Sequence, residues 1–140
     1  MRETSGQQLH EVIADFLEMG HVDNIISMFR QDPSCLLLSG ALIQDERFKV
    51  RMGMAVLFEE LATALPSMDL EAALPSLLAA MGHEAPYVRG DAAHLLSLIG
   101  SAAALGALTG FLHDPDPQIA EIAKEALELD PRNKEADSDA

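Results

Sequence analysis

Cysteine, tryptophan and aromatic side chains in general are scarce in this sequence of 140 residues. Cys35 is the only cysteine, which excludes an intramolecular disulfide and a thiolate cluster for zinc. Aromatic residues make up 4% of the chain, with no tryptophan, which is too few for the stacking platforms that bind single-stranded nucleic acid. Because Cys35 stands next to three leucines, we expect a buried structural thiol and not a nucleophile.

Basic residues are also few. Nine Lys and Arg stand against 23 Asp and Glu, which gives a formal net charge of −14. A chain this acidic repels phosphate, so neither nucleic acid nor an anionic membrane surface is expected as a partner. The natural partners are basic or mixed-charge protein surfaces. Apolar residues make up 49% of the chain, enough to bury the core of one compact domain or one short solenoid.

The N-terminus lacks the apolar core of a signal peptide, so a cytoplasmic location is expected. The longest uncharged run covers residues 95–112 and approaches the length of a membrane span. Glycines and hydroxyl residues interrupt this run, and neither Lys nor Arg anchors its ends. We therefore expect a turn at Gly100 and Ser101, and no membrane insertion.

Helical periodicity dominates the chain, and no segment alternates apolar and polar residues over the length of a strand. A capping-box pattern at Ser5 and Gln8 predicts the start of the first helix, and Gly20 predicts its end. About eight helices are predicted in all, over residues 5–20, 23–30, 33–43, 47–63, 70–81, 86–99, 101–112 and 117–129. The remaining residues, 130–140, are predicted to be a polar mobile tail.

Three stretches of the sequence align with one another without gaps. Each begins with a leucine and reaches a β-branched residue 14 positions later; the pairs are Leu36 and Val50, Leu74 and Val88, and Leu105 and Ile119. Seven extra residues between the first two units fall near residues 63–69. Each unit therefore consists of a helix, a short acidic turn and a second helix. One such pair cannot bury its apolar face alone, so the units are expected to stack around a continuous core.

Residues 86–100, which read PYVRGDAAHLLSLIG, resemble the second helix of a HEAT-like repeat, in particular the short bacterial form named after phycobilisome-lyase subunits. The resemblance is good over about residues 71–129, weaker over 33–65 and absent before that. It implies an all-α fold, a right-handed α-solenoid of HEAT-like helical hairpins. The implied organisation is N-terminal capping helices over 1–32, three repeats over 33–129 and the tail over 130–140, in a bacterial protein.

Three relatives with this architecture imply different functions. Deoxyhypusine hydroxylase carries His-Glu pairs just after the Val-Arg of its repeats and binds iron with them; the matching positions here hold Met52-Gly53, Gly90-Asp91 and Glu121-Ile122. That ligand set is missing, so neither an enzyme nor a catalytic residue, cofactor or metal site is expected. DNA-alkylation-repair HEAT proteins have a basic groove with aromatic clamps, which this acidic chain lacks. Phycobilin lyases are longer and usually paired, and the resemblance to them implies architecture only.

The polar side chains of the repeats leave two interpretations open. The five histidines lack the spacing that places two ligands on one helical face, so surface or interhelical roles are expected. Arg51 and Arg89 occupy equivalent repeat positions, where the third repeat has Ala120. We expect a structural ladder in which each guanidinium bridges the acidic turns at 45–46, 84 and 114–116. The alternative is that these arginines anchor a carboxylate of a partner.

The repeat phase also predicts which residues lie on the inner face formed by the second helices. Met52 and Met54 point about 200° apart, so both cannot face the core. The predicted face carries Met52, Val56, Glu59 and Glu60 from the first unit, Gly90, His94 and Ser97 from the second, and Glu121, Glu125 and Glu128 from the third. It is apolar at one end and acidic at the other, which suits a basic or amphipathic segment of another protein.

These patterns predict non-catalytic protein–protein interaction, as a small cytoplasmic adaptor. One alternative is an accessory or lyase-like subunit that acts on a cofactor-bearing protein. Another is a homo-oligomeric structural protein that self-associates through its Leu and Met surface.

Overall fold

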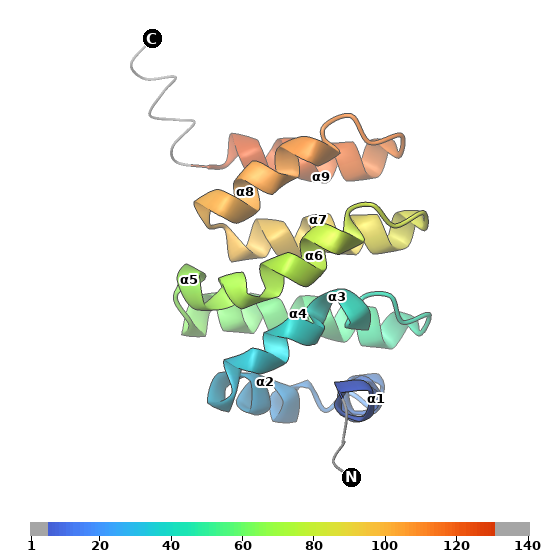
Figure 1. Ribbon diagram of the computed structural model, residues 1–140, viewed down its shortest axis with the longest axis vertical. Coiled ribbons are helices and arrows are strands. Elements are labelled where there is room, and N and C mark those ends of the chain that lie inside the picture. Colours follow the sequence, from blue (N-terminus) through green and yellow to red (C-terminus); the bar gives the residue numbers. More distant parts are fainter. Residues whose placement is uncertain (1–5, 131–140) are drawn as a thin grey trace.

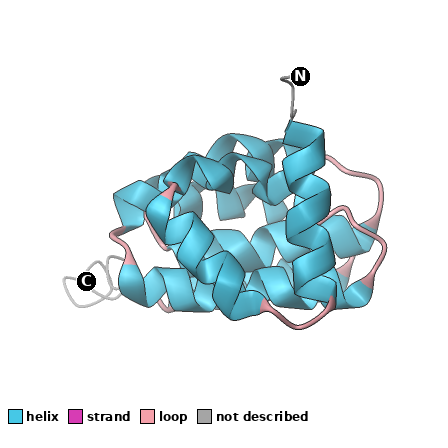
Figure 2. Ribbon diagram, turned by 90° about the horizontal axis from the view of Figure 1, so that it is seen from below, coloured by secondary structure: helices cyan, strands magenta, loops and turns pink. Residues whose placement is uncertain are grey.

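The computed structural model describes residues 6–130, and every regular element in that range is helical (Figures 1 and 2). The elements are α1 (Gly6–Glu18), α2 (Val22–Gln31), η1 (Pro33–Leu38), α3 (Ser39–Leu42), α4 (Phe48–Ala64), α5 (Ser67–Leu70), η2 (Glu71–Ala73), α6 (Leu74–Ala80), α7 (Pro86–Ile99), α8 (Ala102–Leu108), η3 (Thr109–Phe111) and α9 (Pro117–Glu128). The all-α prediction is confirmed. The cap predicted at Ser5 and the tail predicted beyond residue 130 lie outside the described residues.

The helices form hairpins stacked in two layers. The first helices, α3, α6 and α8, lie on one side, and the second helices, α4, α7 and α9, lie on the other (Figure 1). In the second layer α4 packs on α7 and α7 on α9, while α1 and α2 pack on α4 at the N-terminal end. The second helices therefore lie side by side, as the stacking of equivalent repeats requires.

The repeat phase identifies the core correctly. The equivalent residues Val50, Val88 and Ile119 are all buried in one continuous apolar cluster, to which Phe29 and Phe58 contribute two of the largest side chains. The seven extra residues between the first two units contribute to the turn after α4 and to α5. Short 3₁₀ segments extend several of the first helices, so these are less regular than the sequence predicts.

Proline and glycine set the ends of the second helices. Pro86 and Pro117 stand in the first turns of α7 and α9, where a missing N–H costs no hydrogen bond. Gly100 ends α7 in the left-handed conformation, with φ 67°, and the Ser101 side chain caps α8 by accepting a hydrogen bond from Ala104 N at 3.2 Å. The uncharged run is thus broken where the sequence predicts. Among the described residues, no helix is long and apolar enough to cross a membrane.

Candidate functional site

The residues predicted for the inner face all lie on the three second helices. On α4, Met52 is 50% exposed and Val56 is 40% exposed, whereas Met54 is fully buried, as the 200° offset requires. The predicted glutamates of α4 and α9 are exposed, and His94 and Ser97 on α7 are half-buried. We call this exposed side of α4, α7 and α9 the second-helix face.

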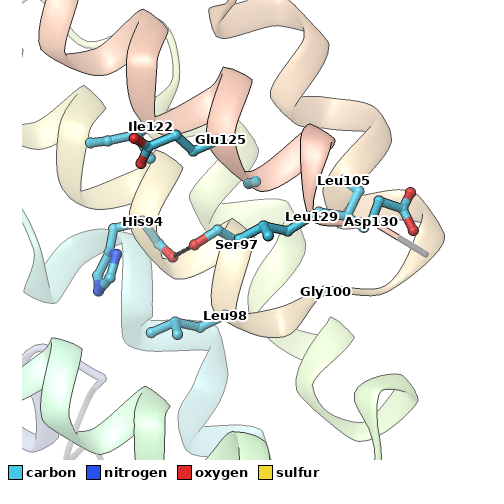
Figure 3. Close-up of a pocket in the computed structure, with 10 residues that line it drawn as sticks. His94, Ser97, Leu98, Gly100, Leu105, Ile122, Glu125, Leu129 and Asp130 are labelled. Atoms are coloured by element: carbon cyan, nitrogen blue, oxygen red, sulfur yellow. Dashed lines mark hydrogen bonds between the residues drawn. The ribbon is translucent and has the colours of Figure 1, made fainter. Parts of the chain in front are cut away.

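A groove runs between α7 and α9 on this face. Two hollows of about 470 Å³ and 450 Å³ share His94 and Ile122 in their walls, and we call the two together the α7–α9 groove; Figure 3 shows the first of them. The groove is lined by Pro86, Tyr87, Gly90, Asp91, His94, Ser97, Leu98 and Gly100 of the second repeat, Leu105 of α8, and Asp116, Gln118, Ile119, Ile122, Glu125, Ala126, Leu129 and Asp130. Of the predicted residues, the groove brings together Gly90, His94, Ser97 and Glu125.

Ser97 and His94 are not arranged as a nucleophile and its base. Ser97 Oγ donates a hydrogen bond of 2.6 Å to the backbone carbonyl of His94, while the His94 ring points away from that hydroxyl (Figure 3). A serine activated by histidine needs a hydrogen bond to the imidazole itself. The pair therefore forms part of a groove wall and not a nucleophile with its base.

Asp91 is a groove residue that the sequence analysis did not single out. Its carboxylate lies 3.5 Å from the Arg51 guanidinium, and one of its oxygens is buried with no hydrogen bond shown. Burial raises the pKa of Asp91, and the nearby charge of Arg51 opposes that rise. The repeat alignment did not point to Asp91, because the equivalent positions in the other two repeats are Gly53 and Ile122.

Met52 and Val56 line a different groove, between α4 and the N-terminal helices. This α1–α4 groove has a volume of about 270 Å³ and is lined by Leu17, Glu18, Met19, Gly20, Val22, Lys49, Met52, Gly53 and Val56. A Cβ atom at Gly53 would lie 3.0 Å from the Leu17 side chain, so the glycine lets α1 approach α4. The sequence-derived face is thus divided between two grooves, and Glu59, Glu60, Glu121 and Glu128 line neither.

Arg89 joins the second and third repeats. Its guanidinium donates to both carboxylate oxygens of Asp114, at 2.9 Å and 3.1 Å, and to the backbone carbonyls of His83 and Glu84, at 3.0 Å each. Asp114 is 6% exposed, and the Arg89 guanidinium lowers the pKa of its carboxyl. The planar fork of arginine suits this set of acceptors, which lysine could not match.

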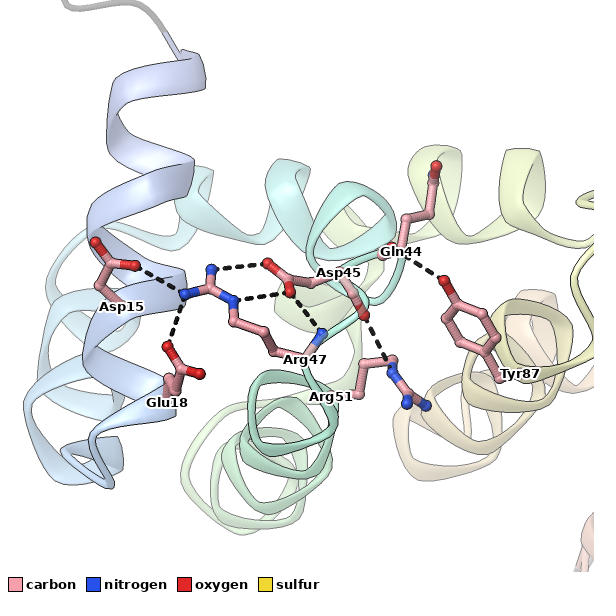
Figure 4. Close-up of polar contacts among 7 residues, drawn as sticks. All are labelled: Asp15, Glu18, Gln44, Asp45, Arg47, Arg51 and Tyr87. Carbon is pink, nitrogen blue, oxygen red and sulfur yellow. Dashed lines mark hydrogen bonds and ion pairs between the residues drawn. The ribbon is translucent and has the colours of Figure 1, made fainter.

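Arg51 occupies the equivalent position one repeat earlier, with different contacts (Figure 4). It donates a hydrogen bond of 3.1 Å to the carbonyl of Asp45, and its guanidinium lies 4.4 Å from the centre of the Tyr87 ring and 5.4 Å from that of Phe48. With Asp91 at 3.5 Å, Arg51 contacts two residues of the next repeat. Its contacts with the second repeat therefore combine cation–π stacking with one ion pair.

Arg47, which the sequence analysis missed, joins the N-terminal helix to the first repeat (Figure 4). It forms ion pairs with Asp15 at 3.0 Å, Glu18 at 2.8 Å and Asp45 at 2.9 Å. Its hydrogen bond lowers the pKa of Asp45. The repeat alignment gave no sign of this cluster, because α1 precedes the repeats and the residue equivalent to Arg47 in the second repeat is Ala85.

The positions that would hold iron in a deoxyhypusine hydroxylase do not fit that metal here. They carry Met52-Gly53, Gly90-Asp91 and Glu121-Ile122, which offer two carboxylates and no imidazole. Within residues 6–130, no group of three or more His, Cys, Asp or Glu side chains is placed to hold a metal ion. We therefore derive no metal chemistry from these positions.

Comparison with known proteins agrees with the stacked hairpins. The family model for HEAT repeats matches residues 38–128. Deoxyhypusine hydroxylase from Bos taurus is 35% identical over 82 residues, which cover 57% of this chain and 27% of that protein. The chain thus spans about a quarter of the length of this relative, and no solved structure matches significantly. The chain belongs to the HEAT repeat family.

Proposed function

We propose that the chain is a non-catalytic protein-binding module, a small cytoplasmic adaptor of the short phycobilisome-lyase type, that binds a segment of a partner on its second-helix face. The observation that carries this proposal is that two grooves, with apolar side chains in their walls, open on the exposed side of α4, α7 and α9. HEAT repeats present extended surfaces of this kind, and concave sites with apolar floors are where peptides dock.

The composition of the face favours a basic or amphipathic partner. Met52 and Val56 offer apolar area that a partner can bury, at about 25 cal/mol for each Å² removed from water. The exposed glutamates Glu59, Glu60 and Glu121 lie outside the grooves, where charges steer association more than they add affinity. Affinity is therefore expected to fall with added salt, mainly through slower association.

The relationship to an enzyme does not change the proposal. The similarity to deoxyhypusine hydroxylase covers 27% of that protein, and the residues at its iron positions do not fit the metal. Arg51 and Arg89 make their contacts within the chain, so we assign them to the structural ladder and not to the binding of a partner's carboxylate.

Site-specific photo-crosslinking in cells tests the face. A photoreactive amino acid at Val56 or Glu125 is expected to capture a partner protein, whereas the same group at Leu37, which is 56% exposed on η1, is not. The purified partner is then expected to bind the Met52→Asp, Val56→Asp double variant more weakly than the unaltered chain. Crosslinks from Leu37 alone, or equal binding by the double variant, would assign the partner to another surface. Crosslinks only between copies of this chain would support the homo-oligomer instead.

A further inference from the structure

We infer that the outward side of the first helices is an interface on which two copies of this chain pack face to face. We call this side the first-helix face; it is formed by η1 and α3, by α6, and by α8 and η3. The inference goes beyond the proposed function, because it concerns the layer opposite the second-helix face. It is carried by the lack of charge on this face and by the arrangement of its large and small side chains.

The first helices carry no charged side chain. The segments 33–44, 72–82 and 101–112 contain no Asp, Glu, Lys or Arg, although at the 23% of the whole chain segments of this combined length would hold about eight. A helix with one side in water ordinarily places charged residues there. The second helices do so, with Lys49 and Glu125 among their exposed residues. The first-helix face is therefore composed like the core of an interface, where charged residues are depleted.

Apolar side chains are exposed on this face. Leu37 on η1 is 56% exposed and Leu78 on α6 is 44% exposed. Ala41, Ala79 and Gly110, which share one repeat position, are exposed as well. Figure 1 is viewed onto this layer, with the first helices in front of the second helices. A second apolar surface would remove these side chains from water.

The arrangement of large and small side chains makes the face complementary to itself. Leu37 stands at the η1 end of the layer, whereas α8, at the other end, exposes only alanine and glycine (Figure 1). The repeat alignment gives Gly106 the position that Leu37 has in the first unit, and a methyl group on Gly106 would meet nothing within 4 Å. A two-fold axis along α6 therefore lays Leu37 of each copy over Gly106 of the other, and places Leu78 beside its own equivalent.

Charge decides between a second copy and other occupants. A nucleic acid would find no cation on the first-helix face, and helices that lie on a membrane carry Lys or Arg beside their apolar side, which these helices lack. A basic segment gains from contact with carboxylates, and those of the second helices lie on the opposite face. Carboxylates such as Asp32 and Glu46 lie beyond the ends of the first helices and are exposed. A second copy therefore offers an equally uncharged surface without burying a carboxylate.

The size of the face sets the expected strength of the dimer. Each first helix, with its 3₁₀ segment, spans about 15 Å, and three such helices packed about 10 Å apart cover about 30 Å. The face is thus about 450 Å² in projection, whereas a standard interface buries about 800 Å² of each partner. We therefore expect a weak, reversible dimer, with a Kd of about 10–100 µM.

Added salt is expected to strengthen this dimer. Two copies with a net charge of −14 repel each other, and salt screens the repulsion without removing the apolar contact. Sedimentation equilibrium is expected to give a Kd about tenfold lower in about 0.5 M than in about 0.05 M sodium chloride. A basic partner on the second-helix face would respond to salt in the opposite direction.

One substitution on the face and a matched control test the interface. Leu78→Glu places two carboxylates beside the two-fold axis, whereas Val12→Glu makes the same change of charge at a side chain that is 43% exposed on α1, outside the face. We expect Leu78→Glu to weaken dimerisation at least about tenfold and Val12→Glu less than about threefold. Both side chains are exposed, so both variants are expected to fold, which thermal melts verify.

Engineered cysteines test the two-fold arrangement. Cys35 is 3% exposed, so the unaltered chain presents no accessible thiol. Under mild oxidation Leu78→Cys alone is expected to form a covalent dimer, whereas Leu37→Cys and Gly106→Cys are expected to form one only when the two variants are mixed. Val56→Cys, on the second-helix face, is expected to stay monomeric.

Several results would overturn the inference. These are a monomer at every concentration, a dimer that dissociates as salt is added, equal dimerisation of Leu78→Glu and the unaltered chain, and a covalent dimer of Leu37→Cys alone or of Val56→Cys in place of Leu78→Cys. A monomer that sediments with phosphatidylcholine vesicles would assign the face to lipid, and capture of a different protein through Leu37 would assign it to that protein. Capture of a partner at Val56 or Glu125 bears on the proposed function alone, so either conclusion can fail without the other.

Discussion

Replacing Gly40 with alanine tests how closely the first helices pack. Gly40 in α3 lies against Ser76 in α6, and its N–H donates a hydrogen bond of 2.9 Å to Ser76 Oγ. A methyl group at Gly40 would lie 2.7 Å from both the carbonyl carbon and the Cβ of Ser76, and closer still to the carbonyl oxygen. Because two of these atoms belong to the backbone, a side-chain rotation cannot relieve the overlap. The two helices must move apart.

The expected cost follows from three contributions. Forcing a methyl group into packed backbone costs about 1–3 kcal/mol, and weakening the hydrogen bond to Ser76 costs about 1 kcal/mol. The higher helix propensity of alanine returns at most about 1 kcal/mol. We expect Gly40→Ala to lower the free energy of unfolding by about 2 kcal/mol, which for a chain of this size lowers Tm by about 6–8 °C.

Urea and thermal unfolding followed by far-UV circular dichroism measure this cost. Gly106→Ala is the matched control, because a methyl group on this α8 glycine meets open space; we expect it to raise stability by about 0.5–1 kcal/mol. The Gly40→Ala, Ser76→Ala double variant is expected to stay destabilised, since the backbone overlap remains. Full stability of Gly40→Ala would refute the close approach. Recovery in the double variant would assign the effect to the Ser76 side chain.

Substitutions at three further residues test one contact between repeats and one helix cap. Arg89→Lys is expected to lower Tm, and Arg89→Ala to lower it further, since an ammonium cannot span the four acceptors; calorimetry measures both. Asp114→Asn is expected to destabilise at neutral pH. Because Arg89 holds the folded pKa of Asp114 below its usual 3.8, this contribution is present above pH 3.8 and is lost as the pH falls through the folded pKa, so melts of the two proteins should converge in acid. Ser101→Ala removes the cap of α8 and is expected to cost about 1 kcal/mol in urea unfolding.

The sequence predicts the fold well because the repeat pattern carries the same information three times. The positions of Val50, Val88 and Ile119 identify the buried side of the second helices, and Gly100 with Ser101 identifies the break in the uncharged run. Each of these signals marks either the end of a helix or the phase of a repeat, and can be read from residues that are close in the sequence. None depends on how distant segments meet.

The surface is less predictable from the same pattern. Repeat phase gives the residues that point outward, but it does not say that α1 and α2 pack beside Met52 and Val56 and form a separate groove with them. Asp91 and Arg47 were missed because neither recurs in the other repeats. Contacts at the non-repeating end, and single polar residues within a groove, depend on three-dimensional packing that one sequence does not contain.

The position of α9 in the stack has a consequence for the cooperativity of unfolding. Within the described residues α9 packs chiefly on α7, α8 and η3, whereas α7 packs on both α4 and α9 (Figure 1). In a chain of nearest-neighbour units, a pair with a described neighbour on one side opens at a lower free energy than a pair with neighbours on both sides. Backbone amides of α9 are therefore expected to exchange with deuterium through local opening, and those of α7 only through global unfolding. A ligand that bridges α7 and α9 would slow exchange in α9 first, because binding raises the free energy of local opening. Deuterium exchange of the α9 amides would therefore report whether the ligand is bound.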